Sequence, residues 1–335
     1  MSDITRERVI VIGAGIAGCI ASSVLKAYTP LVIDAREEPG SLTVHDAVMR
    51  LRDSKVAEVI GAEYTPELVH KDIYMDGRLK GRSDIRANNL YSRKVYGALG
   101  RRSLNGVGDV KRFIINRYPK PPKVFWGWKL LKLNQGKILL QRTVEDEKMV
   151  DIEEMEVEYD WLISTIPMPD MMNIAAQDIM DPDIRKEYKF SYSPIYVMRL
   201  HLNLPSSVHQ TVYFPEEDSP IYRITIQNKD VIIESMESDC DDFWEYLEWA
   251  FGISEKEIAH EILKWKKINI GKIHPIDEDL RLRYIMLLTD QHRVLSFGRF
   301  SVWKPLRTDQ LLSDIEKIRR LISASEIKGL YRSRL

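Results

Sequence analysis

The pattern of hydrophobic and polar positions at the start of the chain predicts a parallel α/β unit. Residues 8–12, RVIVI, form a short apolar run typical of a buried strand, and residues 16–28 carry the small and apolar side chains of a helix that packs on a sheet. A second apolar run, LVIDA (31–35), is followed by EEPG, which interrupts the pattern. We therefore expect a strand, a tight turn, a helix and a second strand.

The pattern changes after this unit. Residues 44–75 and the segment DVKRFIINRY (109–118) are expected to be helical. The segment KVFWGWKLLKLNQGKILLQRT (123–143) predicts a hairpin that turns at NQG, and a charged excursion (145–158) follows it. The segment YDWLISTIP (159–167) then predicts a strand that ends in a turn.

The second half of the chain predicts mainly antiparallel structure. Short β-rich runs separated by turn residues occupy residues 188–234, and residues 241–267 are expected to be helical. Residues 293–322 predict a strand, a loop and a long closing helix, for which Thr308 is the expected N-cap.

Composition narrows the class of protein. The chain of 335 residues has ordinary hydrophobic and charged contents of 44% and 30%, and only two cysteines. We therefore expect a cytoplasmic globular protein without a disulfide framework. No segment is apolar enough to span a membrane, and the first residues do not resemble a signal peptide. The seven histidines show no metal-ligand spacing, so no metal site is expected.

A basic segment lies between Arg78 and Lys123. It carries thirteen Lys or Arg residues and only two acids, in a chain whose formal net charge is −1. The segment predicts a groove for an anionic substrate, such as a nucleotide, a phosphorylated metabolite or a nucleic acid. The alternative is a surface loop paired with the acidic stretch 145–160. The candidate substrate-binding residues are Arg101 and Arg102, in a glycine-flanked loop, and Tyr222 and Arg223, on a predicted strand.

The turn after the first strand has the spacing G-x-G-x-x-G at Gly13, Gly15 and Gly18. Gly13 allows the tight turn, Gly15 lets backbone approach a pyrophosphate, and Gly18 permits close packing of helix and strand. Asp34 ends the second strand, where a carboxylate accepts hydrogen bonds from an adenosine ribose. Arg36 could meet the 2′-phosphate of NADP, but Asp34 would repel that phosphate. The motif predicts a bound dinucleotide and by itself leaves a nicotinamide and a flavin nucleotide both open.

Three segments together resemble the FAD-contacting stretches of the amine oxidase, protoporphyrinogen oxidase and UDP-galactopyranose mutase superfamily. They are VIVIGAGIAGCIASSVL with LVIDARE, YDWLISTIP, and SFGRFSVWKPLRTDQLLSDI. The resemblance implies a tightly bound FAD. The cofactor-binding residues that it implies are Gly13, Ala14, Gly15, Ile16, Ala17, Gly18, Asp34, Ala35, Arg36, Thr165, Pro167, Gly298, Arg299, Asp309 and Gln310. The sequence departs from the family at Gly40, where a glycine pair is usual, and it lacks the histidine-bearing glycine loop of the mutases.

The fold that the resemblance implies is α/β, a Rossmann-like FAD-binding domain with an inserted α+β substrate domain that contains an antiparallel sheet. The FAD-binding domain is expected to comprise residues 1–43, 120–172 and 290–335. Residues 44–119 are expected to form a helical, basic cap, and residues 173–289 the substrate domain.

Three functions are open at this point. The first is a flavin-dependent enzyme of amine-oxidase type that oxidises or cleaves a C–N bond in an anionic, phosphate-bearing substrate, such as a nucleotide or a modified base in nucleic acid. For it, Trp303 is a candidate aromatic wall beside the flavin, and Lys304 is a candidate to bind the flavin or a substrate anion. The second is a UDP-sugar mutase-like isomerase, and the third is a non-catalytic nucleotide- or nucleic-acid-binding protein with a vestigial cofactor fold. The oligomeric state is left open.

Overall fold

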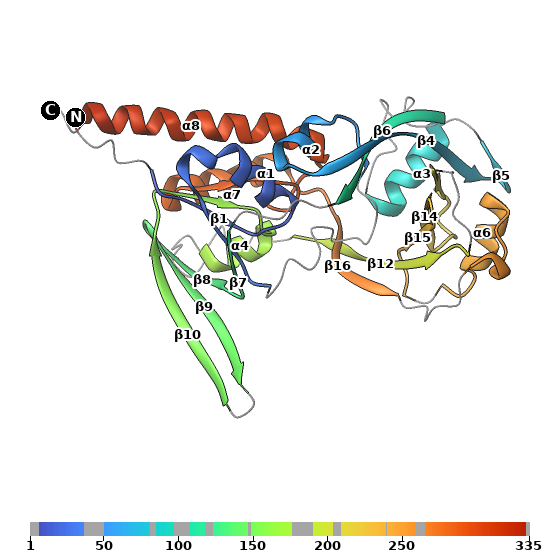
Figure 1. Cartoon of the computed structure of the whole chain (residues 1–335), viewed down its shortest axis with the longest axis horizontal. Helices are drawn as coiled ribbons and strands as arrows, with labels where there is room; N and C mark the ends of the chain where they lie inside the picture. The colour runs from blue at the N-terminus through green and yellow to red at the C-terminus, as the bar shows by residue number, and fades with distance from the viewer. Residues whose placement is uncertain are drawn as a thin grey trace.

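A five-stranded parallel sheet forms one layer of the molecule (Figure 1). The computed structural model describes residues 7–36, 50–80, 85–96, 108–117, 123–146, 149–175, 190–203, 209–238, 240–258 and 265–332. The strand order is β17-β11-β1-β2-β7, and every pairing is parallel. The strands are β1 (Val9–Ile12), β2 (Leu31–Asp34), β7 (Val124–Trp126), β11 (Trp161–Ser164) and β17 (Val294–Ser296). Segments from the start, middle and end of the chain thus share this layer.

Helices cover both faces of the parallel sheet, as its apolar strands require. On one face, α1, α2 and α8 share a core with Val9 and Val11, and on the other face α4 and α7 share a core with Ile10 and Ile12. The helices are α1 (Ile16–Val24), α2 (Lys55–Ile60), α4 (Met168–Ala175), α7 (Glu278–His292) and α8 (Leu311–Arg332). The predicted Rossmann-like α/β layer is confirmed.

A nine-stranded sheet forms the second layer, in the order β16-β12-β15-β14-β13-β4-β6-β3, with β5 paired to β4. The pairing of β13 with β4 is parallel, and the other pairings are antiparallel. Helix α6 (Phe243–Phe251) packs on one face and α3 (Ile85–Val95) on the other. The strands are β3 (Arg50–Leu51), β4 (Glu63–Met75), β5 (Arg78–Leu79), β6 (Gly108–Arg117), β12 (Tyr192–His201), β13 (His209–Tyr213), β14 (Ile221–Gln227), β15 (Asp230–Ser235) and β16 (Lys266–Ile273).

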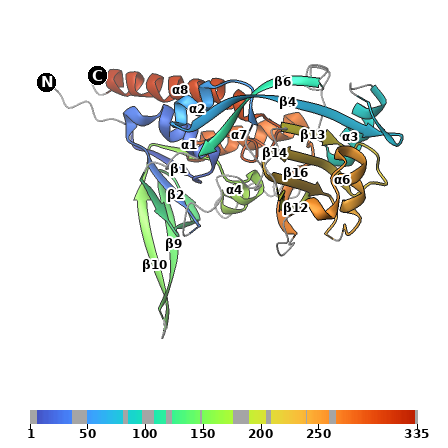
Figure 2. The ribbon, with the colours of Figure 1, turned by 45° about the vertical axis from the view of Figure 1, so that its right-hand side comes forward.

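A third, three-stranded sheet has the order β10-β9-β8. Its strands are β8 (Lys129–Asn134), β9 (Lys137–Asp146) and β10 (Met149–Glu158). The predicted turn at NQG is confirmed, with Gly136 at a φ of 76°. Most of the charged excursion expected after this hairpin is a strand, because residues 149–158 form β10, which is paired with β9 along its length. Both views show the β9–β10 ribbon projecting away from the body of the molecule (Figures 1 and 2).

The helix predicted over residues 44–75 is wrong for most of its described part. Only α2 is helical there, whereas β4 is a 13-residue strand that pairs with β6 on one edge and β13 on the other. The spacing of Leu68, Val69 and Ile73 also fits one face of a helix, so pairing with distant strands decides the outcome. The helix expected over residues 109–118 is wrong for the same reason, because β6 occupies this segment. In place of a helical cap, the described part of residues 44–119 contributes four strands with α2 and α3.

Two helix boundaries also differ from the prediction. Within the described part of residues 241–267, the expected helix is limited to α6, which ends where Gly252 adopts a φ of 65°. The same described part also contains a 3-10 turn, η3 (Glu255–Glu257), and the start of β16. Thr308 is not the N-cap, because Arg307 caps the 3-10 turn η4 (Thr308–Gln310) that precedes α8. The domain boundaries given above stay a prediction. None of the helices within the described residues has the length and apolarity needed to cross a membrane.

Candidate dinucleotide and anion site

The glycine turn lies where β1 ends and α1 begins. Gly13 has a φ of 98°, and a Cβ atom there would lie 2.3 Å from Thr165 Oγ1. A Cβ atom on Gly18 would lie 1.9 Å from the carbonyl oxygen of Gly13, so this glycine lets the helix pack directly against the turn. A Cβ atom on Gly15 would meet nothing within 4 Å. Gly15 is the N-cap of α1 and has no side chain to cap the helix, so no capping side chain competes with a phosphate for the first backbone N–H groups.

Asp34 lies beside this turn at the end of β2. Its Oδ2 accepts a 2.7 Å hydrogen bond from the backbone N–H of Ala14, and Arg36 donates to both carboxylate oxygens from Nε (2.8 Å) and Nη2 (2.7 Å). Burial raises the pKa of the Asp34 carboxyl, but the hydrogen bonds from Arg36 and Ala14 outweigh burial and lower it. Asp34 is therefore an ionised acceptor at the position where a dinucleotide fold holds a ribose.

A cavity of about 430 Å³ opens at the carboxyl ends of β1 and β2. Ligands of open parallel sheets bind at this edge. The cavity walls include Gly13, Asp34, Ala35, Trp128 and Pro167. The position and the mixed apolar and polar walls suit the adenosine half of a dinucleotide.

The second predicted segment reaches the same turn from β11. Thr165 Oγ1 donates to the carbonyl oxygens of Ile12 (2.8 Å) and Gly13 (3.2 Å), and its backbone N–H donates to the carbonyl oxygen of Ile12 at 2.9 Å. These bonds tie the end of β11 to the end of β1. Thr165 and Pro167 are therefore brought to the dinucleotide turn, as the resemblance implies.

The third segment reaches helix α1 through Gly298. This glycine has a φ of 94°, and a Cβ atom there would lie 2.8 Å from the Cβ atom of Ala17. The next residue, Arg299, has its Nε atom buried without a hydrogen-bond partner in the described part of the chain. Asp309 and Gln310 lie in η4. Asp309 forms a 3.1 Å ion pair with the Arg307 side chain, and Gln310 Oε1 accepts a 2.9 Å hydrogen bond from the Arg307 backbone N–H. Both residues directly precede α8, and among the described residues neither forms a hydrogen bond or an ion pair with the glycine turn.

The two candidate catalytic residues are adjacent but differ in environment. Trp303 is buried, has a φ of 48°, packs edge-to-face on Phe190 at 5.1 Å, and donates from Nε1 to the carbonyl oxygen of His274 at 3.1 Å. Lys304 is half exposed, and its Nζ lies 3.3 Å from Glu278 Oε1. Their catalytic roles stay predictions.

Tyr222 and Arg223 are brought together with a buried carboxylate on the neighbouring strand. The Tyr222 hydroxyl donates to Glu234 Oε1 at 2.8 Å, and Arg223 donates to both carboxylate oxygens of Glu234, from Nη2 at 2.6 Å and from Nε. The Glu234 side chain is 1% exposed. Burial lowers the pKa of the Arg223 guanidinium, but the charge of Glu234 outweighs burial and raises it. Arg101 and Arg102 lie outside the described residues.

The same face of the nine-stranded sheet carries further cations that the sequence analysis did not single out. Arg50 donates to Gln227 Oε1 (2.9 Å), Thr211 Oγ1 (2.5 Å) and the carbonyl oxygen of Ile226 (3.1 Å), all of them neutral acceptors. Lys71 lies across from Thr211, and its Nζ donates to the Tyr213 hydroxyl at 3.4 Å. Lys272 Nζ lies 4.0 Å from the centre of the Tyr222 ring. We call Arg50, Lys71, Arg223, Lys272 and Arg299 the cationic sheet face.

Arg299 lies between this face and the glycine turn. It follows Gly298 in the chain, its charge lowers the pKa of Lys272, and its own pKa is affected by Tyr222 and Arg223. Arg223 has a carboxylate partner within 4 Å, namely Glu234. Among the described residues, the other four members of the cationic sheet face have none. Burial lowers the pKa of Arg50 to about 10 and that of Lys272 to about 7, and the positive charge of Arg223 adds to both effects. The five cations are half-buried, and clustered positive charges that are partly removed from water repel one another, so this face is suited to an anion.

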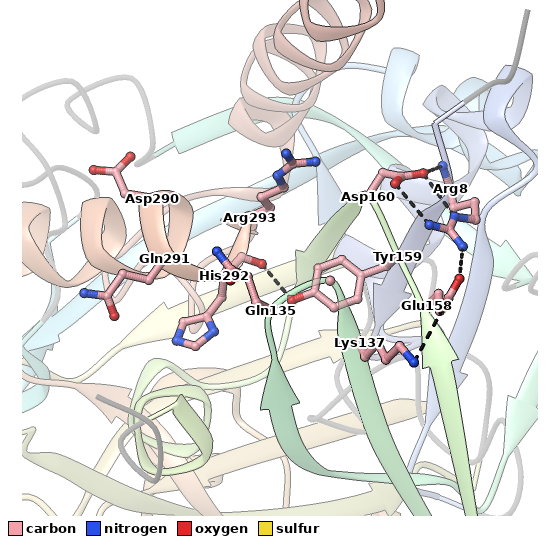
Figure 3. A pocket seen from close by; sticks show the side chains of 11 residues that line it. Arg8, Gln135, Lys137, Glu158, Tyr159, Asp160, Asp290, Gln291, His292 and Arg293 are labelled. Atoms are coloured by element: carbon pink, nitrogen blue, oxygen red, sulfur yellow. Dashed lines mark hydrogen bonds and ion pairs between the residues drawn. The ribbon is translucent and has the colours of Figure 1, made fainter. Parts of the chain in front are cut away.

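A second cavity of about 440 Å³ lies at the opposite, amino-terminal edge of the parallel sheet (Figure 3). On one side Arg8 pairs with Glu158 (2.5 Å) and Asp160 (3.2 Å), and in the centre the Tyr159 hydroxyl donates to the carbonyl oxygen of His292 at 2.7 Å. Because ligands of such sheets bind at the carboxyl edge, this cavity is not the dinucleotide site. Over the described part of the chain, no cluster of His, Cys, Asp or Glu side chains is arranged to hold a metal ion.

Solved structures of several enzymes resemble this one. A crystal structure of reduced UDP-galactopyranose mutase has a TM-score of 0.65 at 14% identity and covers 94% of this chain and 96% of that chain. A fatty acid isomerase from P. acnes that produces CLA has a TM-score of 0.59 at 10% identity, covering 93% and 97%. An oxidoreductase from Methanosarcina mazei has a TM-score of 0.55 at 9% identity, covering 87% and 94%.

No protein-family model and no curated protein matches the sequence. The structural likeness extends over nearly the whole chain, and at these identities it concerns the fold. The resemblance that the three sequence segments carry is therefore confirmed at that level. The chain has the fold of these enzymes, with a Rossmann-like parallel layer and a separate, mainly antiparallel sheet.

Proposed function

We propose that this protein is an FAD-dependent enzyme that acts on an anionic, phosphate-bearing substrate. The observation that carries the proposal is the cationic sheet face beside the glycine turn, because Arg50, Lys71, Lys272 and Arg299 have no carboxylate within salt-bridge distance among the described residues. Clustered, half-buried charges of one sign are stabilised when a ligand of opposite sign enters. A phosphate or diphosphate group supplies that charge and accepts hydrogen bonds from several donors at once.

The residues around the turn fit a dinucleotide cofactor. The open space at Gly15 and the start of α1 would hold the pyrophosphate, and the ionised Asp34 would hold the ribose. The Asp34 carboxylate, which already engages Arg36, disfavours the 2′-phosphate of NADP at this point. A bound flavin would supply the redox-active, nucleophilic ring system, while the chain supplies binding, orientation and charge.

For the reaction we favour a redox-neutral isomerisation of a sugar linked to a nucleoside diphosphate. The enzyme whose structure gives a TM-score of 0.65 is named as a UDP-galactopyranose mutase, and the cationic sheet face suits a diphosphate. An amine substrate carries a positive charge near neutral pH and would be repelled by Arg50, Lys71 and Arg299. The buried Trp303 and Phe190 pair supports oxidation or cleavage of a C–N bond as the second candidate, since that chemistry needs an aromatic wall.

The first test is the visible absorption spectrum of the purified protein, followed by heat release and identification of any chromophore. Released FAD, or uptake of added FAD, supports the cofactor assignment, and a colourless protein that takes up no FAD contradicts it. A panel of nucleoside diphosphate sugars is then incubated with the oxidised and with the chemically reduced protein. Product formed only by the reduced protein, without oxygen consumption, supports the isomerisation. Oxygen consumption with peroxide release supports the oxidative candidate instead.

The substrate assignment needs a matched pair of variants. Lys272→Met removes a cation of the cationic sheet face, and Lys267→Met removes an exposed lysine of the same strand. We expect the first to weaken binding of inorganic pyrophosphate by about tenfold or more and the second to leave it unchanged, because hydrogen bonds to charged groups contribute about 1.5–3 kcal/mol. Equal effects of the two variants would contradict the assignment of the anion to this face.

A further inference from the structure

Tyr213 lies in the middle of the cationic sheet face. It is the last residue of β13 and pairs with Arg223 of β14 on one side and Ile73 of β4 on the other. Its hydroxyl accepts a 3.4 Å hydrogen bond from Lys71 Nζ, and the same Nζ lies 5.8 Å from the centre of its ring. The ring of Tyr91, on α3, packs edge-on against it at 5.5 Å.

The charged groups that act on this hydroxyl are cations from four neighbouring strands. They are Arg50 of β3, Lys71 of β4, Arg112 of β6 and Arg223 of β14. Burial alone raises the pKa of a phenol, but Lys71, Arg223 and Arg50 outweigh burial and lower the pKa of Tyr213 below its ordinary range. Among the described residues, the phenol of Tyr91 also faces Tyr213, and burial raises the pKa of Tyr91.

Tyr222, on the next strand, is in the opposite situation. Its hydroxyl donates to the carboxylate of Glu234, and burial together with that charge raises its pKa. Tyr222 therefore stays protonated. The two tyrosines differ because Tyr213 has an ammonium as its hydrogen-bond partner and Tyr222 has a carboxylate. A neighbouring ammonium favours the ionised phenol, so Tyr213 gives up its proton more readily than an ordinary tyrosine, and exchange of a proton with the substrate is what acid–base catalysis requires.

We propose that Tyr213, with Lys71 beside it, is the acid–base residue for the substrate bound on the cationic sheet face. The inference rests on the proposed function, which places the substrate on this face. In the forward step a substrate hydroxyl gives its proton to the phenolate oxygen of Tyr213, and the substrate oxygen keeps the electron pair of the broken O–H bond. The return step gives the proton back. Lys71 is a positioning residue that keeps its hydrogen bond to the Tyr213 oxygen in both steps.

The test uses the near-ultraviolet absorbance of tyrosinate in the full-length protein, titrated with base. Of the 15 tyrosines, we expect one to ionise before the others, and Tyr213→Phe should remove that first step. Tyr64→Phe is the control. Tyr64 lies at the other end of β4, and its hydroxyl contacts a carboxylate, that of Glu58, at 3.3 Å. Lys71→Met keeps the phenol but removes the ammonium, so its first step should move to higher pH. An early step that persists in Tyr213→Phe would overturn the proposal.

Inorganic pyrophosphate separates this inference from the proposed function. Its binding is followed by calorimetry, and the titration is repeated in its presence. A bound anion cancels part of the positive charge, so the Tyr213 step should move to higher pH, with no such shift in Tyr213→Phe. Failure of pyrophosphate to bind the wild-type protein contradicts the proposed anionic substrate. Binding that leaves the Tyr213 step unmoved contradicts the role of Tyr213 and leaves the proposed function standing.

Discussion

The glycine turn allows packing and cofactor binding to be separated by two single substitutions. Gly18→Ala places a methyl group 1.9 Å from the carbonyl oxygen of Gly13, whereas Gly15→Ala places one where no atom lies within 4 Å. Both changes add the same methyl group within one turn of the chain. We expect the first to act on stability and the second to act on cofactor affinity.

The magnitudes follow from these distances. Real Cβ contacts essentially never fall below 3.0 Å, so in Gly18→Ala the helix and the turn must separate by about 1 Å. Overpacking of this kind costs about 1–3 kcal/mol, and the better helix propensity of alanine offsets up to about 1 kcal/mol. We therefore expect the free energy of unfolding to fall by about 2 kcal/mol. In Gly15→Ala the methyl group blocks the approach of a phosphate, and loss of one charge-assisted hydrogen bond weakens FAD binding by about 1.5–3 kcal/mol, about 10- to 150-fold in Kd.

The assay combines urea unfolding of the apoprotein with titration of FAD followed by quenching of flavin fluorescence. Gly15→Ala should unfold at nearly the wild-type urea concentration and bind FAD weakly. Gly18→Ala should unfold at a lower urea concentration. The interpretation of the turn would be refuted if Gly15→Ala bound FAD as tightly as the wild-type protein, or if Gly18→Ala were as stable as the wild-type protein.

Three further predictions concern charged residues. Glu234→Gln leaves Arg223 without its buried counter-charge, so the free energy of unfolding should fall by about 2–4 kcal/mol in urea titrations. Calorimetry should show tighter pyrophosphate binding by this variant, because the anion then meets an unpaired Arg223. The pKa of Lys272 is lowered to about 7, and a bound anion raises it, so pyrophosphate binding should take up a proton above pH 7 and weaken as pH rises. Calorimetry in two buffers of different ionisation enthalpy measures the proton uptake. Lys272→Met should abolish the proton uptake. Lys304→Ala removes an ion pair whose two side chains are 50% and 55% exposed, so unfolding should change by less than about 1 kcal/mol, and unchanged turnover would argue against a catalytic Lys304.

The dinucleotide turn was predictable because its signals are local. Gly13, Gly15 and Gly18 lie within six residues of one another, directly between an apolar strand and a helix, and the need for each glycine follows from that geometry alone. The antiparallel runs between residues 192 and 235 were predictable for a similar reason, since short alternating segments end at turn residues. Strand β4 was not, because its sequence fits a helix as well and its two partners lie far away in the chain.

The cationic sheet face could not be predicted from spacing. Its members come from positions as distant as Arg50 and Arg299, and they converge only because the pairing of the sheet brings together four strands and one turn. The high positive charge of residues 78–123 pointed to an anion, but Lys71, Arg223 and Lys272 lie outside that segment. The sequence signal that could have found them is the run IYRITIQ, in which Arg223, Thr225 and Gln227 alternate with apolar residues on a buried strand.

The order of strands in the parallel sheet has a consequence for how the protein is made. The first strand, β1, lies next to β11, and β11 in turn lies next to β17, whose residues are 294–296. During synthesis the ribosome must add residues 13–296 after β1 before this layer can close, and contacts over such long loops form slowly. Until then β1 and β2 also lack α8, which follows β17 in the chain and completes their core. We therefore expect the yield of folded protein to be governed by how well the unfinished chain avoids aggregation, and to rise with slower synthesis or added chaperones.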